Sequence, residues 1–299
     1  MRATEGHAHL APLQIGPRLF TWGERTYVMG IVNVTPDSFS GDGILAGPPP
    51  NTVAAAVDQA RQMVAEGADL LDIGGESTRP GHAEVDEAEE LRRVVPVVAA
   101  IRQALPETPI SIDTTKPTVA EAALAAGADL VNDIWGIAED DSLARVAAEH
   151  RVALVLMHNR VEARYDDVAA EIVADLAAAI ERAVRAGVVR EQLIVDPGFG
   201  FGKTAEHNVA ALAGIGALQI LGRPILLGTS RKSTLGKILD LPADERLEAT
   251  LATTAIGIAG GVDMVRVHDV RANVRAARTA DAIIRGNWRP SAAAEGAQP

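Results

Sequence analysis

Eight short, continuously apolar runs are the feature of this sequence that most constrains its fold. Each run is too short for a helix, and its apolar residues follow one another instead of alternating with polar ones. A strand that is buried on both faces of a parallel sheet has this pattern. The runs are YVMGIVN (27–33), DLLDIG (69–74), PISID (109–113), DLVND (129–133), ALVLMH (153–158), LIVD (193–196), PILLGTS (224–230) and DMVRVH (263–268).

A helical pattern lies between consecutive runs. The clearest extends from Asp166 to Ala186, where apolar residues recur at every fourth position and two acidic residues open the helix. A second is predicted from Pro117 to Ala126, with proline in the first turn. A third, from Asp86 to Leu105, contains Pro96, so we expect a kink or a break there.

The regular alternation of strands and helices predicts the fold class. Eight strands with about eight helices fit an α/β protein with a (β/α)8 TIM barrel as a single domain. A doubly wound open sheet is the structural alternative. We place the barrel domain at residues 16–286, with an N-terminal tail at 1–15 and a C-terminal tail at 287–299. Two long loops rich in glycine and proline, 34–52 and 75–87, are predicted to be lids or binding loops.

Composition excludes several classes of protein. The 299 residues are 47% apolar, enough for a large core, and their net charge of -12 argues against nucleic-acid or membrane-surface binding. The absence of cysteine excludes disulfides and thiolate metal sites. The N-terminus lacks the apolar segment of a signal peptide, and the longest charge-free apolar stretch, 249–262, is shorter than the roughly 20 residues of a membrane span. We therefore expect a cytoplasmic protein.

Polar side chains follow every predicted strand. In a TIM barrel these positions meet at the carboxyl-terminal mouth, where active sites lie. A mouth that merely faced water would also be polar, but it would be rich in Lys and Glu, whereas Asp, Asn, His, Ser and Arg predominate here. The residues are Asn33, Glu76 to Arg79, Asp113, Asn132, Asp133, His158, Asp196, Ser230 to Lys232 and Arg266 to Asp269.

The stretch DPGFGFGK (196–203) resembles a phosphate loop but matches neither common type. A Walker loop requires glycine where Pro197 stands, and in a dinucleotide fingerprint the third glycine would come one residue later. What remains is a turn whose glycines let the backbone approach a flat ligand, with Phe199 or Phe201 able to stack on it. The alternative is a tight structural turn with two core phenylalanines.

Neighbouring residues suggest what the flat ligand is. The Asp196 carboxylate can accept two parallel N–H bonds, and Asn132 can supply a matching donor and acceptor, which suits a fused aminopyrimidinone ring. A cluster of cations in an otherwise acidic protein suits an anionic group such as a phosphate. The expected members of this cluster are Arg79, Lys232, Arg266 and His268.

Seven motifs, in order along the chain, resemble the dihydropteroate synthase family. They are GIVNVTPDSFS (30–40), GGESTRPG (74–81), SIDT (111–114), VND (131–133), DPGFGFGKT (196–204), GTSRKS (228–233) and RVHDV (266–270). The resemblance covers roughly residues 27–285, with about one motif per barrel strand, and His158 is the strand-end residue that is least like a family motif.

The resemblance implies a transferase of folate biosynthesis, the target of sulfonamides. Such an enzyme joins 6-hydroxymethyl-7,8-dihydropterin diphosphate to 4-aminobenzoate, giving 7,8-dihydropteroate and diphosphate. It implies that Mg²⁺ assists departure of the diphosphate and that the amine attacks the resulting pterin cation. It also suggests a homodimer.

The resemblance also implies residue roles. The positions of the pterin pocket are taken by Asp113, Asn132, Asp196 and Lys232, with Met157 as an apolar wall. The diphosphate positions are taken by Asn33, Arg266 and His268, and Asn33 also matches the Mg²⁺ position. The aminobenzoate region is matched by Thr78, Arg79, Phe201 and Ser230. Asp113, Lys232, Arg266 and His268 are the expected catalytic residues.

One departure and three alternatives stay open. The family motif SFSDGG reads SFSGDG here (38–43), which displaces the acid to Asp42 and leaves its role open. A corrinoid methyltransferase that uses methyltetrahydrofolate would share the pterin pocket but would not need the cation cluster. A Schiff-base aldolase would use Lys232, although the sequence shows no apolar surroundings for it. A catalytically inactive paralogue would bind pterin alone.

Overall fold

A closed barrel of parallel strands forms the centre of the molecule. The computed structural model describes residues 10–34, 49–76, 85–136, 140–286 and Trp288. Eight strands lie in the order β8-β7-β6-β5-β4-β3-β10-β9. The sheet closes between β8 and β9, where the Val195 amide donates to the Pro224 carbonyl at 2.9 Å and Val195 bridges Ile225. The strands are β3 (Tyr27–Asn33), β4 (Leu70–Gly74), β5 (Ile110–Asp113), β6 (Leu130–Asp133), β7 (Ala153–Met157), β8 (Leu193–Asp196), β9 (Leu226–Leu227) and β10 (Met264–Val267).

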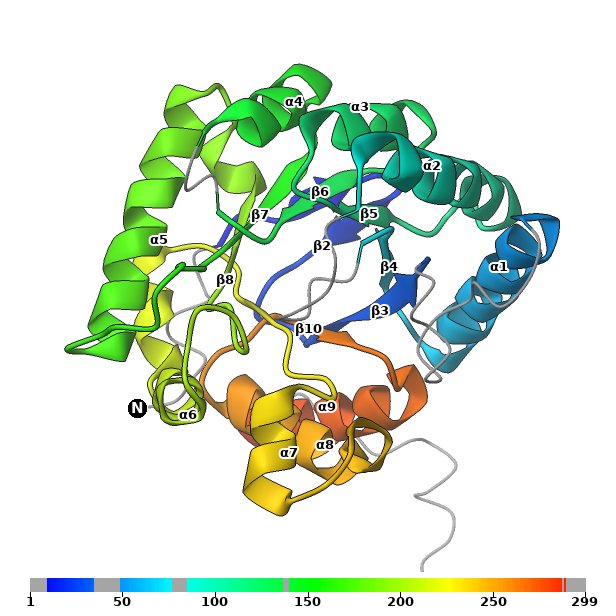
Figure 1. Cartoon of the computed structure of the whole chain (residues 1–299). Helices are drawn as coiled ribbons and strands as arrows, with labels where there is room; N and C mark the ends of the chain where they lie inside the picture. The colour runs from blue at the N-terminus through cyan, green and yellow to red at the C-terminus, as the bar shows by residue number, and fades with distance from the viewer. Residues whose placement is uncertain (1–9, 35–48, 77–84, 137–139, 287, 289–299) are drawn as a thin grey trace, which may run out of the picture.

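Helices surround the barrel as a ring (Figure 1). They are α1 (Pro49–Glu66), α2 (Glu87–Ala104), α3 (Pro117–Ala125), α4 (Ser142–His150), α5 (Val168–Arg185), α6 (Ala205–Ala213), α7 (Ser233–Leu239), α8 (Leu247–Ala259) and α9 (Val270–Ile284), with 3₁₀ turns η2 (Arg190–Gln192), η3 (Ile215–Leu221) and η4 (Ala243–Glu245). The TIM barrel prediction is confirmed, and the open sheet is excluded. The described helix α1 begins at Pro49, inside the loop predicted for residues 34–52.

Helix ends follow the sequence signals closely. At the start of α5 the Asp167 side chain accepts a hydrogen bond of 3.1 Å from the Ala170 amide, a standard N-cap. The break expected at Pro96 is wrong, because α2 runs continuously through it. The helix keeps its buried apolar face against the barrel, and this packing offsets the hydrogen bond that the proline removes.

The strands bury two separate apolar layers because successive side chains point to opposite faces. Val28, Leu71, Val131, Leu154 and Val265 point outward and pack in the large core between strands and helices. The inward-pointing side chains near the amino-terminal ends of the strands form a second cluster. Its barrel members are Tyr27, Met29, Leu70, Leu130, Ala153, Val155, Ile194, Leu226 and Met264. The lower barrel is therefore a packed core and not a channel.

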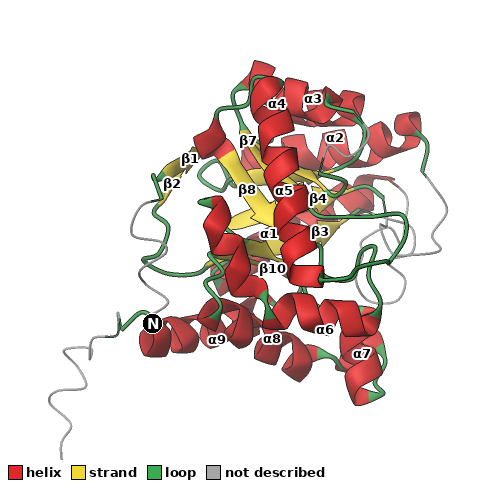
Figure 2. Cartoon of the chain, turned by 90° about the vertical axis from the view of Figure 1, so that its left-hand side faces the viewer, coloured by secondary structure: helices red, strands yellow, loops and turns green. Residues whose placement is uncertain are grey.

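An N-terminal hairpin covers the lower end of the barrel. Strands β1 (Leu13–Ile15) and β2 (Arg18–Phe20) pair antiparallel, and their buried side chains join the inner cluster together with Trp22. Figure 2 shows the hairpin at one end of the barrel. The tail predicted for residues 1–15 is therefore too long, because Leu13 and Ile15 are part of the core.

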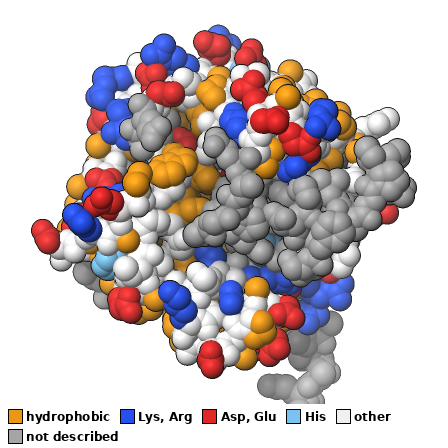
Figure 3. All heavy atoms as spheres, viewed as in Figure 1, with side chains coloured by type: hydrophobic (Ala, Val, Ile, Leu, Met, Phe, Trp, Pro, Cys, Tyr) orange, Lys and Arg blue, Asp and Glu red, His pale blue; other side chains and the backbone are white. Residues whose placement is uncertain are grey.

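The surface carries charges of both signs. On the face drawn in Figure 3, acidic and basic side chains are interspersed around the ring of helices. Among the described residues, no helix has the length and apolar character needed to cross a bilayer. The two ends of the barrel differ. The hairpin covers the amino-terminal end of the strands, and polar side chains lie at the carboxyl-terminal end.

Candidate active site

A polar layer fills the barrel interior above the apolar one. It is made by inward-pointing side chains near the carboxyl-terminal ends of different strands, and each is buried or largely buried. Asp113 and Asp196 are the last residues of β5 and β8, and Asn132 is the last but one of β6. Because side chains alternate along a strand, each of the three points inward, two residues beyond another inward-pointing position. The predicted convergence of strand-end groups at one mouth is therefore observed.

The acid predicted for the pterin and the arginine predicted for the diphosphate share this mouth. Both lie near Gly228, which follows β9: a Cβ atom built there would lie 3.9 Å from Asp196 Oδ2 and 3.8 Å from Arg266 Cβ. Burial raises the pKa of Asp196, while Lys232, the Gly198 amide and Arg266 oppose the shift. The two groups thus sense each other's charge across a short distance.

Arg266 lies between two carboxylates. Its Nε donates to Asp72 Oδ2 at 2.5 Å, and its Nη2 donates to Asp113 Oδ2 at 2.6 Å. Burial lowers the pKa of Arg266, but the two carboxylates raise it by more, so the net shift is upward. Burial raises the pKa of Asp113 to about 7, against the opposing effect of Arg266. Positive charge at the mouth is therefore balanced by acids more closely than the sequence suggested.

Asp72 is a site residue that the sequence reasoning missed. It is fully buried, and besides Arg266 it accepts a 3.2 Å hydrogen bond from Asn132 Nδ2. It stands in the middle of β4 and not at its end, so a search of strand ends passes over it. An acid inside a continuously apolar run was the available signal, since an unpaired buried carboxylate is costly.

The glycine turn after β8 requires glycine at three positions. Gly198, Gly200 and Gly202 have φ values of 67°, 89° and 53°, in the region that side chains disfavour. A Cβ at Gly200 would also lie 2.7 Å from Cδ of Lys232. The turn starts from the site itself, because Asp196 Oδ1 accepts a 2.6 Å hydrogen bond from the Gly198 amide.

Lys232 contacts this turn from the start of α7. Its ammonium donates to the Phe199 carbonyl and lies 4.4 Å from the centre of the Phe201 ring. Phe199 is buried in the outer core, so Phe201 is the ring available for stacking at the mouth. Burial lowers the pKa of Lys232 to about 8, partly offset by Asp196. Lys232 is therefore desolvated, contrary to the sequence-based expectation.

Two residues predicted to serve different substrates are hydrogen-bonded to each other. Ser230 Oγ accepts from the His268 amide at 3.1 Å and lies 2.9 Å from His268 Nδ1. Which of Ser230 Oγ and His268 Nδ1 donates depends on the imidazole tautomer, and the contact in either case fixes the imidazole orientation. Arg231, between Ser230 and Lys232, pairs with Asp269 at 3.0 and 2.8 Å. Its guanidinium is directed to that acid.

Of the remaining predicted residues, the structure describes Asn33 and Met157. Asn33 ends β3, and a Cβ built on Gly74 would lie 3.9 Å from Asn33 Oδ1 and 3.7 Å from Asp113 Oδ2. Met157 is buried at the end of β7, paired in register with Asp196, as an apolar wall residue would be. Thr78, Arg79 and Asp42 lie outside the described residues. Within the described part of the chain, no three His, Asp or Glu side chains cluster as a metal site.

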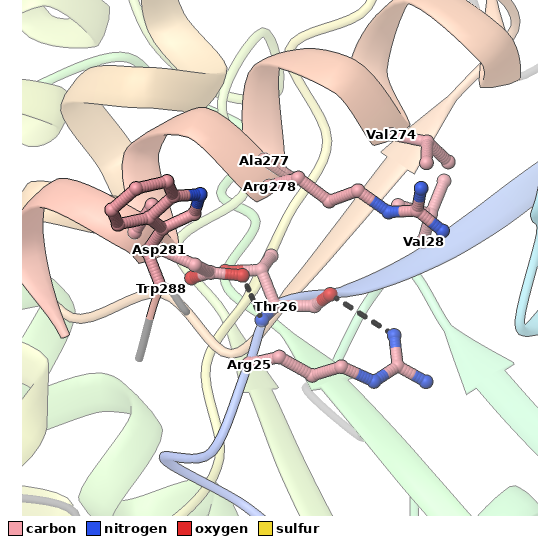
Figure 4. A pocket seen from close by; sticks show the side chains of 9 residues that line it. Arg25, Thr26, Val28, Val274, Ala277, Arg278, Asp281 and Trp288 are labelled. Carbon is pink, nitrogen blue, oxygen red and sulfur yellow. Dashed lines mark hydrogen bonds between the residues drawn. The ribbon is translucent and has the colours of Figure 1, made fainter. Parts of the chain in front are cut away.

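A second hollow lies away from this mouth. A cavity of about 290 Å³ opens between the start of β3 and α9, at the amino-terminal end of the barrel (Figure 4). Its charged side chains are largely engaged elsewhere: Arg25 binds Asp69, and Asp281 accepts from the amide and hydroxyl of Thr26. TIM barrel chemistry occurs at the opposite end, so this cavity is not the active site.

The fold and the polar mouth define a (β/α)8-barrel enzyme whose site brings carboxylates, an amide and cations together at one end of the barrel. The family described as "Pterin binding enzyme" matches residues 29–268. The dihydropteroate synthase of Clostridium beijerinckii is 50% identical over 274 residues, which is 91% of this chain and 100% of that protein.

Solved structures agree with the sequence comparison. Dihydropteroate synthase from Clostridium difficile, solved in the presence of pteroic acid, is 50% identical with a TM-score of 0.84, covering 89% of this chain and 99% of that one. The Xanthomonas albilineans enzyme in complex with 7,8-dihydropteroate is 40% identical with a TM-score of 0.82, covering 91% and 98%. The chain therefore belongs to the pterin-binding enzymes and, among them, to the dihydropteroate synthase family.

Proposed function

We propose that the mouth described above condenses 6-hydroxymethyl-7,8-dihydropterin diphosphate with 4-aminobenzoate, releasing diphosphate and 7,8-dihydropteroate. The observation that carries this assignment is the placement of Asp196 and Arg266 near Gly228, within one barrel mouth. A substrate that joins a flat pterin to a diphosphate through one carbon needs these two recognition chemistries next to each other. Family membership supports the same reaction.

The pterin half occupies the buried polar layer. The Asp196 carboxylate accepts N–H groups of the aminopyrimidinone edge, and the Asn132 amide supplies a donor and an acceptor beside it. Lys232 stands over the glycine turn and faces an acceptor of the ring, while Met157 forms an apolar wall. Acids that are already desolvated are suited to this recognition, because no water has to be removed from them when the ring binds.

Bond cleavage develops two opposite charges, and the mouth has a group for each. The C–O bond between the pterin methylene and the diphosphate breaks with both electrons leaving on the diphosphate oxygen. Arg266 and His268 stabilise that negative charge. The Asp113 carboxylate, held by Arg266, faces the positive charge that forms on the pterin. Arg266 therefore touches both halves of the reaction.

The amine completes the exchange from the side of Phe201 and Ser230. The lone pair of the 4-aminobenzoate nitrogen forms the new C–N bond to the methylene carbon. The nitrogen then loses one proton, which passes to the released diphosphate or to water. Phe201 offers a ring face to the aromatic acid, and the Ser230 hydroxyl lies beside it with His268. Thr78 and Arg79 are proposed for the same region on family resemblance alone.

The oxygen groups next to Gly74 suit a magnesium ion bound together with substrate. Asn33 Oδ1 and Asp113 Oδ2 lie around the space that a Cβ of Gly74 would fill, and Asp113 Oδ1 is buried without a hydrogen-bond partner. Magnesium is commonly held by one or two protein oxygens plus substrate phosphates and water. We propose Asn33 as its protein ligand. When bound, the ion would neutralise charge on the departing diphosphate.

The alternatives lose support. The lowered pKa of Lys232 would suit a Schiff base, but its ammonium is engaged with the Phe199 carbonyl beneath the pterin site. A methyltransferase has no use for Arg266 and His268 beside the pterin pocket. An inactive paralogue would have no reason to keep Asp113, Asn132, Asp196, Lys232, Arg266 and His268 together.

The family resemblance is also the basis for proposing that the protein is a homodimer.

Release of diphosphate tests the proposal. With both substrates and Mg²⁺ present, the protein should release diphosphate and form 7,8-dihydropteroate in equal amounts. We expect no turnover when either the metal is chelated or 4-aminobenzoate is withheld. Pterin binding without any diphosphate release under complete conditions would support the inactive paralogue instead.

A further inference from the structure

A second half-buried lysine, Lys203, binds the same glycine turn as Lys232. Nζ of Lys203 donates to the carbonyls of Gly198 and Phe201, both at 3.1 Å, while Lys232 donates to the carbonyl of Phe199 between them. The two lysines thus hold different carbonyls of one turn. The reaction proposed above uses Lys232 and leaves Lys203 without a role.

The third partner of Lys203 is a histidine from the neighbouring strand end. Nδ1 of His158 lies 2.8 Å from Lys203 Nζ, and Nε2 lies 3.0 Å from Asp175 Oδ2. Burial and the neighbouring Lys203 together lower the pKa of His158 to about 4, against the opposing effect of Asp175, so the imidazole is neutral at pH 7. A neutral ring between an ammonium and a carboxylate accepts at Nδ1 and donates from Nε2. His158 Nδ1 and the two carbonyls are therefore the three close acceptors of the ammonium, and the His158 carbonyl lies farther from Nζ, at 3.5 Å.

The loop after β7 fits tightly against this turn. A Cβ at Gly198 would lie 1.8 Å from the His158 carbonyl, and one at Gly202 would lie 2.4 Å from the Arg160 carbonyl. The Tyr165 hydroxyl donates to the Gly202 carbonyl at 2.8 Å. The turn and the loop after β7 are therefore in close contact, and Lys203 lies where the two loops meet.

We propose that Lys203 is a positioning residue for the reaction: its ammonium, oriented by His158 and Asp175, fixes the glycine turn so that Phe201 is presented to the aminobenzoate and the Phe199 carbonyl to Lys232. The inference rests on the proposed function of the mouth. Lys203 itself touches no substrate, and its effect passes through the backbone of the turn.

Substitution of Lys203 by methionine tests this role. Loss of three hydrogen bonds from a charged donor should loosen the turn and raise KM for 4-aminobenzoate about tenfold, with kcat changed less. Lys237, exposed on α7, provides the matched control: Lys237→Met should leave both constants unchanged. Lys203→Met also leaves buried acceptors unpaired, so it should lower the unfolding temperature whichever role the lysine has. The KM for 4-aminobenzoate, which a purely structural lysine would not change, therefore distinguishes the two roles.

Two substitutions of His158 distinguish its role as a hydrogen-bond acceptor from its role in filling space. His158→Asn keeps an oxygen acceptor near the position of Nδ1 and should keep KM close to that of the wild type. His158→Leu removes the acceptor and should raise KM as Lys203→Met does. Equal KM values for the two variants would contradict the proposal.

The pH profile provides a readout that a packing role would not affect. Burial lowers the pKa of Lys203 to about 7; Asp196 and Asp175 oppose this shift, whereas Lys232 and Arg160 add to it. His158, which also faces the ammonium, stays neutral over this range. As pH rises through about 7, the ammonium is lost, so KM for 4-aminobenzoate should rise in the wild type and stay flat and high in Lys203→Met.

Asp113 and Lys232 titrate in both proteins, so the difference between the two profiles isolates Lys203. Parallel profiles, or a falling unfolding temperature with unchanged KM, would overturn the positioning role while leaving the proposed reaction intact. A wild-type protein that fails to turn over would instead refute the proposed function.

Discussion

Asp72 Oδ2 accepts a 2.5 Å hydrogen bond from Nε of Arg266, joining strands β4 and β10 across the barrel interior. Strand β3 lies between these two strands in the sheet, so the contact is made through the barrel and not along a ladder. It aims the guanidinium so that Nη2 reaches Asp113. A carboxylate in the middle of a strand thus orients the arginine at the mouth.

Removing the Asp72 carboxylate should reduce both stability and activity. Asp72→Leu leaves a buried guanidinium with one partner fewer and should lower the free energy of unfolding by about 3 kcal/mol. It should also reduce kcat/KM at least about tenfold, because Arg266 loses its orientation. Asp72→Asn keeps an acceptor and should cost less on both measures. Urea unfolding and steady-state kinetics measure the two effects.

The control is Asp58→Leu, an exposed acid on α1 that forms a surface pair with Arg61. It should change stability by less than about 1 kcal/mol. If Asp72→Leu behaved like this control, the orienting role of Asp72 would be wrong.

The pKa values of Asp113 and Lys232 predict a bell-shaped profile of kcat/KM. Activity should rise with pH as Asp113 ionises near 7 and fall as Lys232 loses its proton above about 8. Asp113→Asn should leave a slower enzyme without the acidic limb. An unchanged acidic limb in that variant would assign the limb to another group, such as the substrate diphosphate.

Ionisation of Asp113 should raise activity but lower the free energy of unfolding as pH increases. Its folded pKa of about 7 lies above the ordinary value of 3.8, so the folded protein binds more protons than the unfolded chain between these values. The stability that this group contributes is fully present below about 4 and lost as pH rises through 7. The wild type should therefore lose stability relative to Asp113→Asn over that window, measured by denaturant titration at each pH.

Gly200 and Gly222 provide a matched pair of glycines with positive φ, at 89° and 58°. Alanine at either position costs about 1 kcal/mol for the backbone conformation alone. Only at Gly200 would the added Cβ meet a side chain, Lys232, whereas at Gly222 nothing lies within 4 Å. Gly200→Ala should raise KM for the pterin substrate about tenfold, and Gly222→Ala should not. Equal KM values would show that the turn tolerates displacement of Lys232.

Sequence reasoning identified the barrel because its strands are buried on both faces and so appear as uninterrupted apolar runs. The hairpin of β1 and β2 was missed because its strands have three residues each, and alternate exposed and buried positions beside polar residues resemble a tail. The break at Pro96 was predicted from local chemistry, but burial of the α2 face overrides it.

Site residues were recoverable where they lie at or next to the end of a strand, as Asp113, Asn132 and Asp196 do. Asp72 was not, because its partner Arg266 is 194 residues away and no local pattern joins them. The contact between Lys203 and His158 was missed for the same reason, since two separate loops must fold before the pair exists. Arg231 was grouped with the mouth by its neighbours, but its positive φ and its pairing with Asp269 fix its guanidinium on that acid.

Binding of the pterin substrate to Asp196→Ala, measured by titration calorimetry, tests the central claim most directly. The account predicts that the dissociation constant rises at least about 100-fold, because a desolvated carboxylate that accepts two N–H bonds is lost. Asp244→Ala, an exposed acid in η4, should bind as the wild type does. Retention of tight pterin binding by a folded Asp196→Ala protein would contradict the account.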